Sequence, residues 1–359
     1  MKTTNKSSVT HITTPPSDIL VVNAARVSFD KESSFDENGN LSNNDQRLLN
    51  YLAKHNHFTP FTHVRETFAF DENWLDIDWF VQSISQENWA GMVITKVNVN
   101  DKPHWLIRHS LYGWIQLLKL NKIEYLFQPI VEEYITNKLS ALYKGSMTAF
   151  DIYSNSLNIN DNSNNISDYV LYIDDLDKKI ESDPINNPNI FDKHVIEFYQ
   201  PEKIEYFKDI TIRETTSIYT SRQRFKHMVG FTFNEVSKRY VDTQPPYFIP
   251  SQLRKRADDK KQGSMDISCD NEQEALLIYS NILQTIDDAY YKIVNKDGIY
   301  KVCPEQARGI LPQSMITSYY ATGNIKSWKR LITQRLDPHA QSEIRDLAFL
   351  LKEILENAN

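Results

Sequence analysis

Residues 221–240 of the 359-residue chain, SRQRFKHMVGFTFNEVSKRY, form its most informative stretch. Cationic side chains gather here, because residues 222–261 contain 10 Lys or Arg against 4 Asp or Glu. Lys and Arg bind phosphates through charge-assisted hydrogen bonds, Ser and Gln add neutral donors, and His can orient a ring. The pattern indicates a site for an anionic ligand, although a basic surface loop or contacts with nucleic-acid phosphates would also account for the charge.

A histidine-rich segment, HNHFTPFTH at residues 55–63, lies upstream of this stretch. Its His-x-His spacing could supply two metal ligands, but no matching set of Cys or carboxylate residues accompanies it. We therefore expect turn or helix-cap histidines here, and no metal site.

Polar segments downstream contain arginines that could reach the same ligand. These segments are PEQARGILP (304–312), TGNIKS (322–327) and QRLDPHAQ (334–341). Arg308 and Arg335 belong to separate segments and could converge on one anion. Pairing with surface carboxylates is the commoner fate of an arginine, so that alternative stays open.

Taken together and in this order, the segments resemble the flavin-dependent thymidylate synthases. The resemblance covers residues 19–71 and 209–352 and includes NAARVS (23–28), YLAKH (51–55), TPFTH (59–63) and EIR (343–345). The family signature is Arg-His-Arg, followed after seven or eight residues by Ser. This chain has Lys226, His227 and Met228, then eight residues and Ser237, so the spacing is kept while both arginines are replaced.

The resemblance implies an α/β (α+β) fold in which residues 1–71 and 209–359 form one catalytic domain. Residues 72–208 separate these two parts, which lie much closer together in the sequences of the family. Apolar spacing within the segment predicts helices at 74–81, 106–118 and 124–142. We therefore expect a mainly helical insertion at 72–208.

Local patterns predict further elements outside that segment. Alternating or strand-like composition predicts strands at 19–28, 64–70 and 210–220. Apolar residues three and four positions apart predict helices at 46–55 and 271–294. The second of these helices carries a stripe that we expect to face the core: Ala275, Ile278, Tyr279, Ile282, Ile286, Ala289 and Ile293.

For function, the resemblance implies reductive methylation of deoxyuridylate (dUMP) to thymidylate (dTMP). Reduced FAD would donate hydride, 5,10-methylenetetrahydrofolate the carbon, and NADPH the reducing equivalents, in a homotetramer that holds FAD and nucleotide at subunit interfaces. The polypeptide would supply orientation and charge. Such an enzyme needs no cysteine nucleophile, so Cys303 is expected to be a buried, inert thiol.

Carried over position by position, the resemblance assigns two sets of contacts. The positions that contact dUMP are Gln223, Glu235, Ser237, Arg239, Arg308 and Arg335. The positions that contact the flavin are His63, Lys226, His227, Asn324, Arg330 and His339. Arg335 is also expected to be catalytic, because its charge can stabilise negative character on the pyrimidine as C5 becomes nucleophilic.

Two other interpretations stay open. An enzyme of the same scaffold could modify another pyrimidine nucleotide or end at a hydroxymethyl product, since Lys226 and Met228 change the signature. A nucleotide-binding homologue that has lost catalysis would also keep the nucleotide positions.

Composition restricts the class of protein further. Asp and Glu outnumber Lys and Arg by 47 to 40, which makes a general nucleic-acid binder a poor fit. Two cysteines exclude a disulfide framework, and neither the polar first 20 residues nor any later window suits a secretory or membrane-spanning segment. We expect a soluble cytoplasmic protein that binds dUMP, with no nucleic-acid polymer or membrane as partner.

Overall fold

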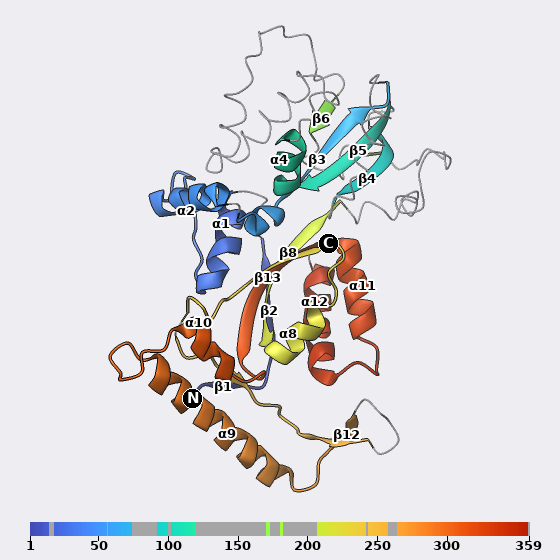
Figure 1. Ribbon diagram of the computed structural model, residues 1–359. Helices are drawn as coiled ribbons and strands as arrows, with labels where there is room; N and C mark the ends of the chain where they lie inside the picture. The colour runs from blue at the N-terminus through green and yellow to red at the C-terminus, as the bar shows by residue number, and fades with distance from the viewer. Residues whose placement is uncertain are drawn as a thin grey trace.

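An antiparallel sheet forms the centre of the computed structural model, which describes residues 1–13, 18–55, 57–73, 92–99, 102–119, 170–172, 180–181, 207–241, 243–257 and 264–357. The strand order is β2 (Ser8–Ile12), β8 (Asp209–Ser217), β13 (Ile316–Asn324) and β9 (Phe231–Glu235). β13 pairs with β8 along its whole length, and every residue of β13 is buried. β13 is therefore the central strand of the fold (Figure 1).

Helices cover one face of this sheet. α8 (Ile218–Arg224) follows β8 directly, while α11 (Ile325–Arg335) and α12 (Ser342–Asn357) follow β13 (Figure 1). Tyr319 and Ala321 of β13 pack into one apolar cluster with Trp328 and the leucines of α11 and α12. The Trp328 indole also donates a hydrogen bond to the carbonyl of Ile210 at 3.1 Å. These contacts fix the axis of α11, whose last residue is Arg335.

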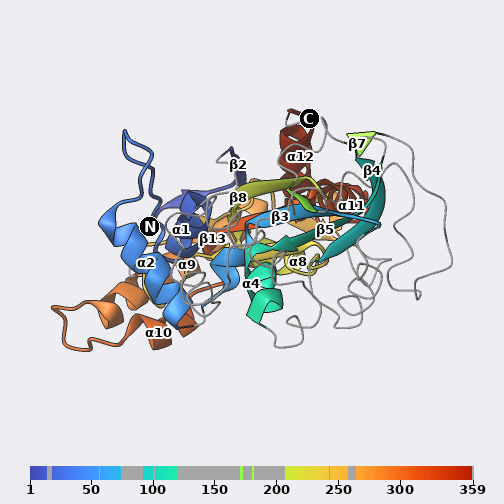
Figure 2. The ribbon, with the colours of Figure 1, turned by 90° about the horizontal axis from the view of Figure 1, so that it is seen from above.

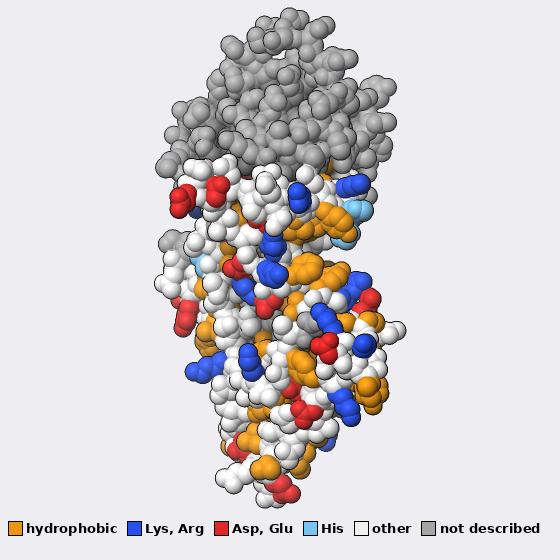
Figure 3. Space-filling model, turned by 90° about the vertical axis from the view of Figure 1, so that its left-hand side faces the viewer, with side chains coloured by type: hydrophobic (Ala, Val, Ile, Leu, Met, Phe, Trp, Pro, Cys, Tyr) orange, Lys and Arg blue, Asp and Glu red, His pale blue; other side chains and the backbone are white. Residues whose placement is uncertain are grey.

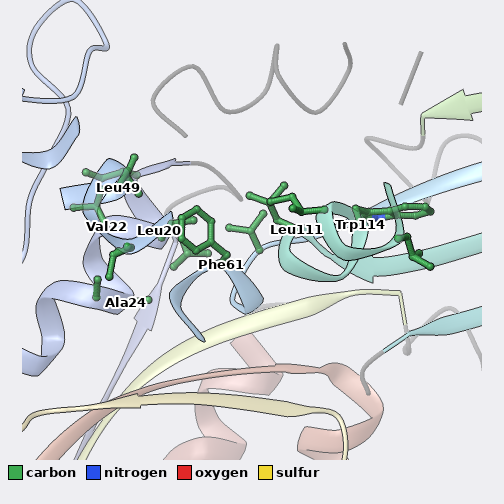
Figure 4. Close-up of a cluster of buried hydrophobic side chains, with 14 of the residues drawn as sticks. Leu20, Val22, Ala24, Leu49, Phe61, Leu111 and Trp114 are labelled. Carbon is green, nitrogen blue, oxygen red and sulfur yellow. The ribbon is translucent and has the colours of Figure 1, made fainter. Parts of the chain in front are cut away.

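The opposite face carries α1 (Asp18–Arg26), α2 (Asn43–Lys54) and the 3-10 helix η2 (Thr59–Thr62). Tyr320, which alternates with Tyr319 and Ala321 along β13, packs into this second cluster. Figure 4 shows apolar side chains of the cluster following one another from α1 and α2 through η2 to α4 (Leu111–Lys119): Leu20, Val22, Ala24, Leu49, Phe61, Leu111 and Trp114.

A second antiparallel sheet contains β3 (Arg65–Asp71), which follows η2 in the chain. Its order is β6 (Val170–Tyr172), β3, β5 (Lys102–Ser110), β4 (Val93–Val99) and β7 (Ile180–Glu181). Figure 1 shows β3, β4 and β5 beyond one end of the central sheet, and Figure 2 shows them from above. α4 packs on β3, because the Trp114 indole donates a hydrogen bond to the Glu66 carbonyl at 3.0 Å.

The helix α9 (Glu272–Val294) lies at the far end of the molecule from the second sheet (Figure 1). Its buried residues are Leu283, Asp287, Tyr290 and Val294. The core stripe predicted for this helix is therefore wrong for Ile278 and Ile282, each 54% exposed, and for Ala289, which is also exposed. Figure 3 views the side of the molecule on the left of Figure 1 and shows hydrophobic side chains at its surface among the charged ones.

Shorter elements complete the described chain. β1 (Thr3–Thr4) pairs with β10 (Tyr247–Phe248), and β11 (Arg254–Arg256) pairs with β12 (Ser264–Ser268). Single-turn helices occur as η1 (Val27–Phe29), α10 (Pro304–Ala307) and η6 (Arg308–Ile310). Within the described ranges, no helix has the length and apolar character needed to cross a membrane.

The α/β (α+β) class is confirmed, as are the helix at 46–55 and the strand at 64–70. The strand predicted at 19–28 is wrong, because α1 and η1 occupy these positions. The apolar residues of α1 are buried on all sides of the helix. A continuous apolar run has no alternation of polar and apolar residues that would distinguish a helix from a strand.

Within the segment 72–208, the residues that the structure describes are not mainly helical. The helix predicted at 106–118 is β5 up to Ser110 and becomes α4 only at Leu111, since β5 pairs with both β3 and β4. The helices predicted at 74–81 and 124–142 lie outside the described residues. In the described part of the segment, four strands accompany one helix.

Candidate active site

The signature motif lies in the turn between α8 and β9, residues 225–230, which we call the signature loop. Phe225 anchors its start, because the ring packs on aromatic rings of β9 and β13. Lys226 is exposed, and Met228 and Val229 are each 70% exposed. The loop therefore presents one cation beside an apolar surface.

Gly230 closes the signature loop against the start of α11. Its φ of 80° lies in the left-handed region, which glycine adopts without steric cost. A Cβ atom here would lie 2.0 Å from Ser327 Oγ and 3.3 Å from Asn324 Nδ2. Asn324, a predicted flavin contact, is buried and caps α11 by accepting a hydrogen bond from the Ser327 amide at 2.8 Å. Gly230 thus lets the loop backbone lie closer to α11 than a residue with a side chain would.

Arg335, at the end of α11, brings two predicted site residues together. Its Nε donates a hydrogen bond to His227 Nε2 at 2.8 Å, and its Nη2 donates to the Gln223 carbonyl at 3.1 Å. Burial and the nearby Arg335 lower the pKa of His227 to about 4. His227 is therefore neutral at pH 7 and leaves the charge of Arg335 uncancelled.

Gln341 belongs to the same group, although it was not among the predicted site residues. Gln223 Nε2 donates a hydrogen bond to Gln341 Oε1 at 2.5 Å. Its position inside the polar segment 334–341 is the sequence feature by which it could have been found. His339 from that segment is exposed and pairs through Nδ1 with Asp337 Oδ1 at 3.0 Å.

Three cations lie in or next to the signature loop in the sequence or the fold: Lys226 within it, and Lys326 and Arg330 on α11, which packs against Gly230. The Arg330 guanidinium donates a hydrogen bond from Nη2 to the Val229 carbonyl at 2.7 Å. Within the described part of the chain, the side chains of Lys226 and Lys326 make no hydrogen bond or ion pair. This donor set fits an anionic ligand such as a flavin dinucleotide, with Met228 available to contact an apolar ring.

A second group of predicted residues gathers around Glu305, at the start of α10. Arg239 Nε pairs with Glu305 Oε1 at 2.8 Å, and Arg308 Nε donates to the Glu305 carbonyl at 3.2 Å. Ser237 Oγ accepts a hydrogen bond from the Arg239 amide at 3.3 Å. Both guanidinium groups are exposed, so this group can bind a phosphate.

Glu235, the last residue of β9, lies between the two groups. Its Oε1 accepts a hydrogen bond from Thr317 Oγ1 at 2.6 Å. The signature loop precedes β9, and Ser237 follows it. The five residues of β9 span about 16 Å, so this length of strand connects the end of the signature loop to the segment that contains Ser237 and Arg239.

His63, a predicted flavin contact, is 2% exposed. Its Nδ1 lies 2.7 Å from Thr322 Oγ1, and its Nε2 lies 3.2 Å from Asn234 Oδ1. Burial lowers its pKa to about 3, so the ring is neutral. Since Asn234 Oδ1 can only accept, the ring proton is on Nε2 and Nδ1 accepts from Thr322. His63 thus joins β9 to β13, and both ring nitrogens are engaged within the protein.

Arg224, which immediately precedes the signature loop, is fully buried and does not reach its surface. Its Nε donates to both carboxylate oxygens of Glu214, at 3.0 and 3.1 Å. The guanidinium carbon lies 4.3 Å from the centre of the Phe231 ring and 5.0 Å from those of Phe233 and Trp328. Among the described residues, Nη1 and Nη2 have no hydrogen-bond partner. Arg224 therefore cannot replace the cation that is missing at Met228.

Cys303 lies just before α10 and is exposed, so the prediction of a buried thiol is wrong. It directly precedes Pro304, the first residue of that short helix. The Cys303 thiol donates a hydrogen bond from Sγ to Gln306 Oε1 at 3.6 Å.

Comparison with known proteins bears on both groups of residues. The family described as "Thymidylate synthase complementing protein" matches residues 10–73 and 193–358, which is more than half of the chain. The flavin-dependent thymidylate synthase of Thermosipho melanesiensis is 34% identical over 170 residues, covering 46% of this chain and 72% of that protein. The chain belongs to this family of thymidylate synthases, and the resemblance inferred from its motifs is confirmed.

The flavin-dependent thymidylate synthase of Aquifex aeolicus is 26% identical over 350 residues, which cover 94% of each protein. An alignment of that extent runs through the segment between the two parts that the family matches. Among solved structures, the UMP/dUMP methylase PolB from Streptomyces cacaoi, bound with 5-Br dUMP, aligns with a TM-score of 0.41 and 15% identity, covering 99% of this chain and 93% of that one.

Proposed function

We propose that this protein is a flavin-dependent thymidylate synthase that converts dUMP to dTMP with FAD, NADPH and 5,10-methylenetetrahydrofolate. The observation that carries the proposal is the junction of Arg335 with His227 and Gln223. It brings the signature segment and the end of α11 together through direct hydrogen bonds. The resemblance to the family implies that nucleotide and flavin contacts meet at this junction.

Arg335 would stabilise negative charge on the pyrimidine ring. Nε and Nη2 are used within the protein, whereas Nη1 makes no hydrogen bond to any described residue and can face a ligand. Lys226, Lys326 and Arg330 would hold the flavin, which when bound supplies the hydride chemistry. Ser237, Arg239 and Arg308 would hold the nucleotide phosphate.

The separation of the two groups along β9 supports a site shared between subunits of a homotetramer. A nucleotide held by Arg239 and Arg308 of one subunit would meet Arg335 of another. The exposed apolar side chains of α9, including Leu277, Ile278 and Ile282, supply a surface for such an assembly.

Product analysis tests the reaction. The purified protein is incubated with FAD, NADPH, methylenetetrahydrofolate and dUMP, and the nucleotides are separated and weighed by mass spectrometry. We expect dTMP, and NADPH oxidation that increases with dUMP. A hydroxymethyl product, or turnover with another pyrimidine nucleotide alone, would support the same-scaffold alternative. Nucleotide binding without flavin or NADPH oxidation would support the non-catalytic homologue.

Mixing two impaired variants tests the shared site. Arg335→Ala and Arg239→Ala are each expected to lose at least nine-tenths of the activity alone, because each removes one half of the site. Co-refolded or co-expressed, they should regain part of the activity through sites built from two intact halves. No recovery in a mixture shown by light scattering to contain hetero-oligomers would place both residues in one subunit's site. Ile278→Asp should dissociate the assembly, while Thr285→Asp, on the exposed surface of the same helix, serves as its control.

A further inference from the structure

Arg65, the first residue of β3, connects the second sheet to the signature loop. Its side chain is 5% exposed, and Nη1 lies 3.3 Å from the Gly230 carbonyl oxygen. The same nitrogen lies 3.4 Å from Asp209 Oδ1 at the start of β8. Gly230 ends the signature loop, so a side chain from the second sheet contacts the loop at its junction with β9.

Arg108 of β5 holds the other oxygen of the same carboxylate, because its Nη2 pairs with Asp209 Oδ2. Arg108 is opposite Thr67 in the β3–β5 register. Since Arg65 and Thr67 lie two residues apart, Arg65 and Arg108 project from the same face of the sheet. Both arginines therefore meet Asp209 from one side.

Burial makes these contacts necessary. A buried cation is costly unless it is paired and its donors are satisfied. Burial lowers the pKa of Arg65 to about 10, so the group is still charged at neutral pH. Asp209 supplies one carboxylate for two guanidinium groups, and the Gly230 carbonyl supplies Arg65 with a further acceptor.

The rest of the loop is held from α11. Arg335 bonds the Gln223 carbonyl before the loop, and Arg330 bonds the Val229 carbonyl within it. Arg65, on β3 of the second sheet, donates to the carbonyl of the next residue, Gly230. The backbone path that sets the places of Lys226 and His227 thus depends on both α11 and the second sheet.

We propose that Arg65 is a positioning residue for the signature loop, held in place by Asp209 and Arg108, so that the second sheet controls how tightly the loop binds its anionic ligand. The identity of that ligand as FAD rests on the proposed function. The positioning role itself concerns the loop backbone and can be measured without ligand.

Hydrogen exchange followed by mass spectrometry measures the loop directly in the full-length, flavin-free protein. The amides of His227 and Phe231 are bonded within the loop region, to the carbonyls of Arg224 and Met228. In Arg65→Met and Asp209→Asn, peptides spanning 225–231 should exchange about tenfold faster, while α1 and α2 peptides stay unchanged. Arg65→Lys, whose ammonium can offer both contacts from one nitrogen, should return most of the protection. Arg47→Met, at an exposed arginine of α2, is the control and should change nothing.

Titration with FAD gives the second readout. We expect Arg65→Met to bind FAD about tenfold more weakly than the unaltered protein. Arg65→Lys and Arg47→Met should bind FAD about as tightly as the unaltered protein. Unchanged loop exchange in both Arg65→Met and Asp209→Asn would overturn the proposal, as would faster exchange spread equally over α1, α2 and the loop. If the unaltered protein binds no FAD, the proposed function fails, while the exchange result still decides the positioning role.

Discussion

Arg335 and His227 lie 108 positions apart in the chain, yet Arg335 Nε donates a hydrogen bond to His227 Nε2 at 2.8 Å. Because Nε2 accepts, the proton of the neutral ring is on Nδ1. The imidazole thereby orients the guanidinium without neutralising it. Lys or Met at this point in the signature would hold Arg335 less well than the retained histidine does.

Replacing Arg335 with Ala should lower dUMP turnover at least tenfold, because a hydrogen bond from a charged group contributes about 1.5–3 kcal/mol. The melting temperature should change little, since Arg335 is only partly buried at a helix end. Steady-state kinetics and isothermal titration with dUMP measure the effect. Arg47→Ala serves as control. Unchanged turnover and dUMP affinity would show that Arg335 has a purely structural role.

The altered signature should make flavin binding weaker than an Arg-His-Arg signature would. Lys226 keeps a charge but lacks the planar two-donor group of arginine, and Met228 carries no charge. We expect partial loss of FAD during purification, weaker binding in Lys226→Ala, and tighter binding in Met228→Arg. Met228 is 70% exposed, so the longer side chain fits without repacking. Quenching of flavin fluorescence measures all three; equal affinity in Lys226→Ala would exclude this loop as the flavin site.

Stability should depend on pH through His63. Its pKa is about 3 in the folded protein and about 6.5 in an unfolded chain, so between these values the unfolded state binds a proton that the folded state does not. The free energy of unfolding should therefore fall as pH drops below about 6.5 and level off near pH 3, by about 1.4 kcal/mol for each unit. Urea unfolding at pH 7.5 and 4.5 should show a smaller difference in His63→Gln. The exposed His339→Gln should behave like the unaltered protein.

Breaking the Arg224–Glu214 pair should be strongly destabilising. Arg224→Met leaves a fully buried carboxylate whose remaining side-chain donor among the described residues is the Tyr319 hydroxyl, at 2.8 Å. Losing one partner of such a pair costs about 3–5 kcal/mol. The double variant with Glu214→Gln should recover part of this loss, because no charge stays buried. Chemical denaturation gives the comparison, and a double variant no more stable than Arg224→Met would contradict the explanation.

Motif order was sufficient to predict the fold class and the family, because each segment needed only its own residues to be recognised. The position of β3 was not predictable in the same way. The strand predicted at 64–70 is present, but its partners β5 and β6 lie in residues 72–208, and no local sequence pattern indicates which sheet a strand joins. The helix α1 was missed because a fully buried apolar run has no polar face to reveal its period.

Within the site, the sequence identified the residues better than their partners. Arg335, His227 and Gln223 come together, and Ser237, Arg239 and Arg308 do so separately. Glu305 and Gln341 lie in polar segments that the sequence singled out, but their partners, Arg239 and Gln223, are distant in the chain, and no spacing marks such pairs. His63 was expected at the flavin, yet its contacts are Thr322 and Asn234, which only the strand register brings near it.

The two neighbours of β3 both come from residues 72–208. Phe68 and Phe70 of β3 are completely buried, and Phe68 packs edge-on against Trp114 from α4. A shortened protein that joined residue 73 directly to residue 207 would leave β3 with two open edges and an uncovered aromatic face. Any compact version designed for biotechnology must therefore keep β5 and β6, which pair with β3, and α4, which covers its aromatic face.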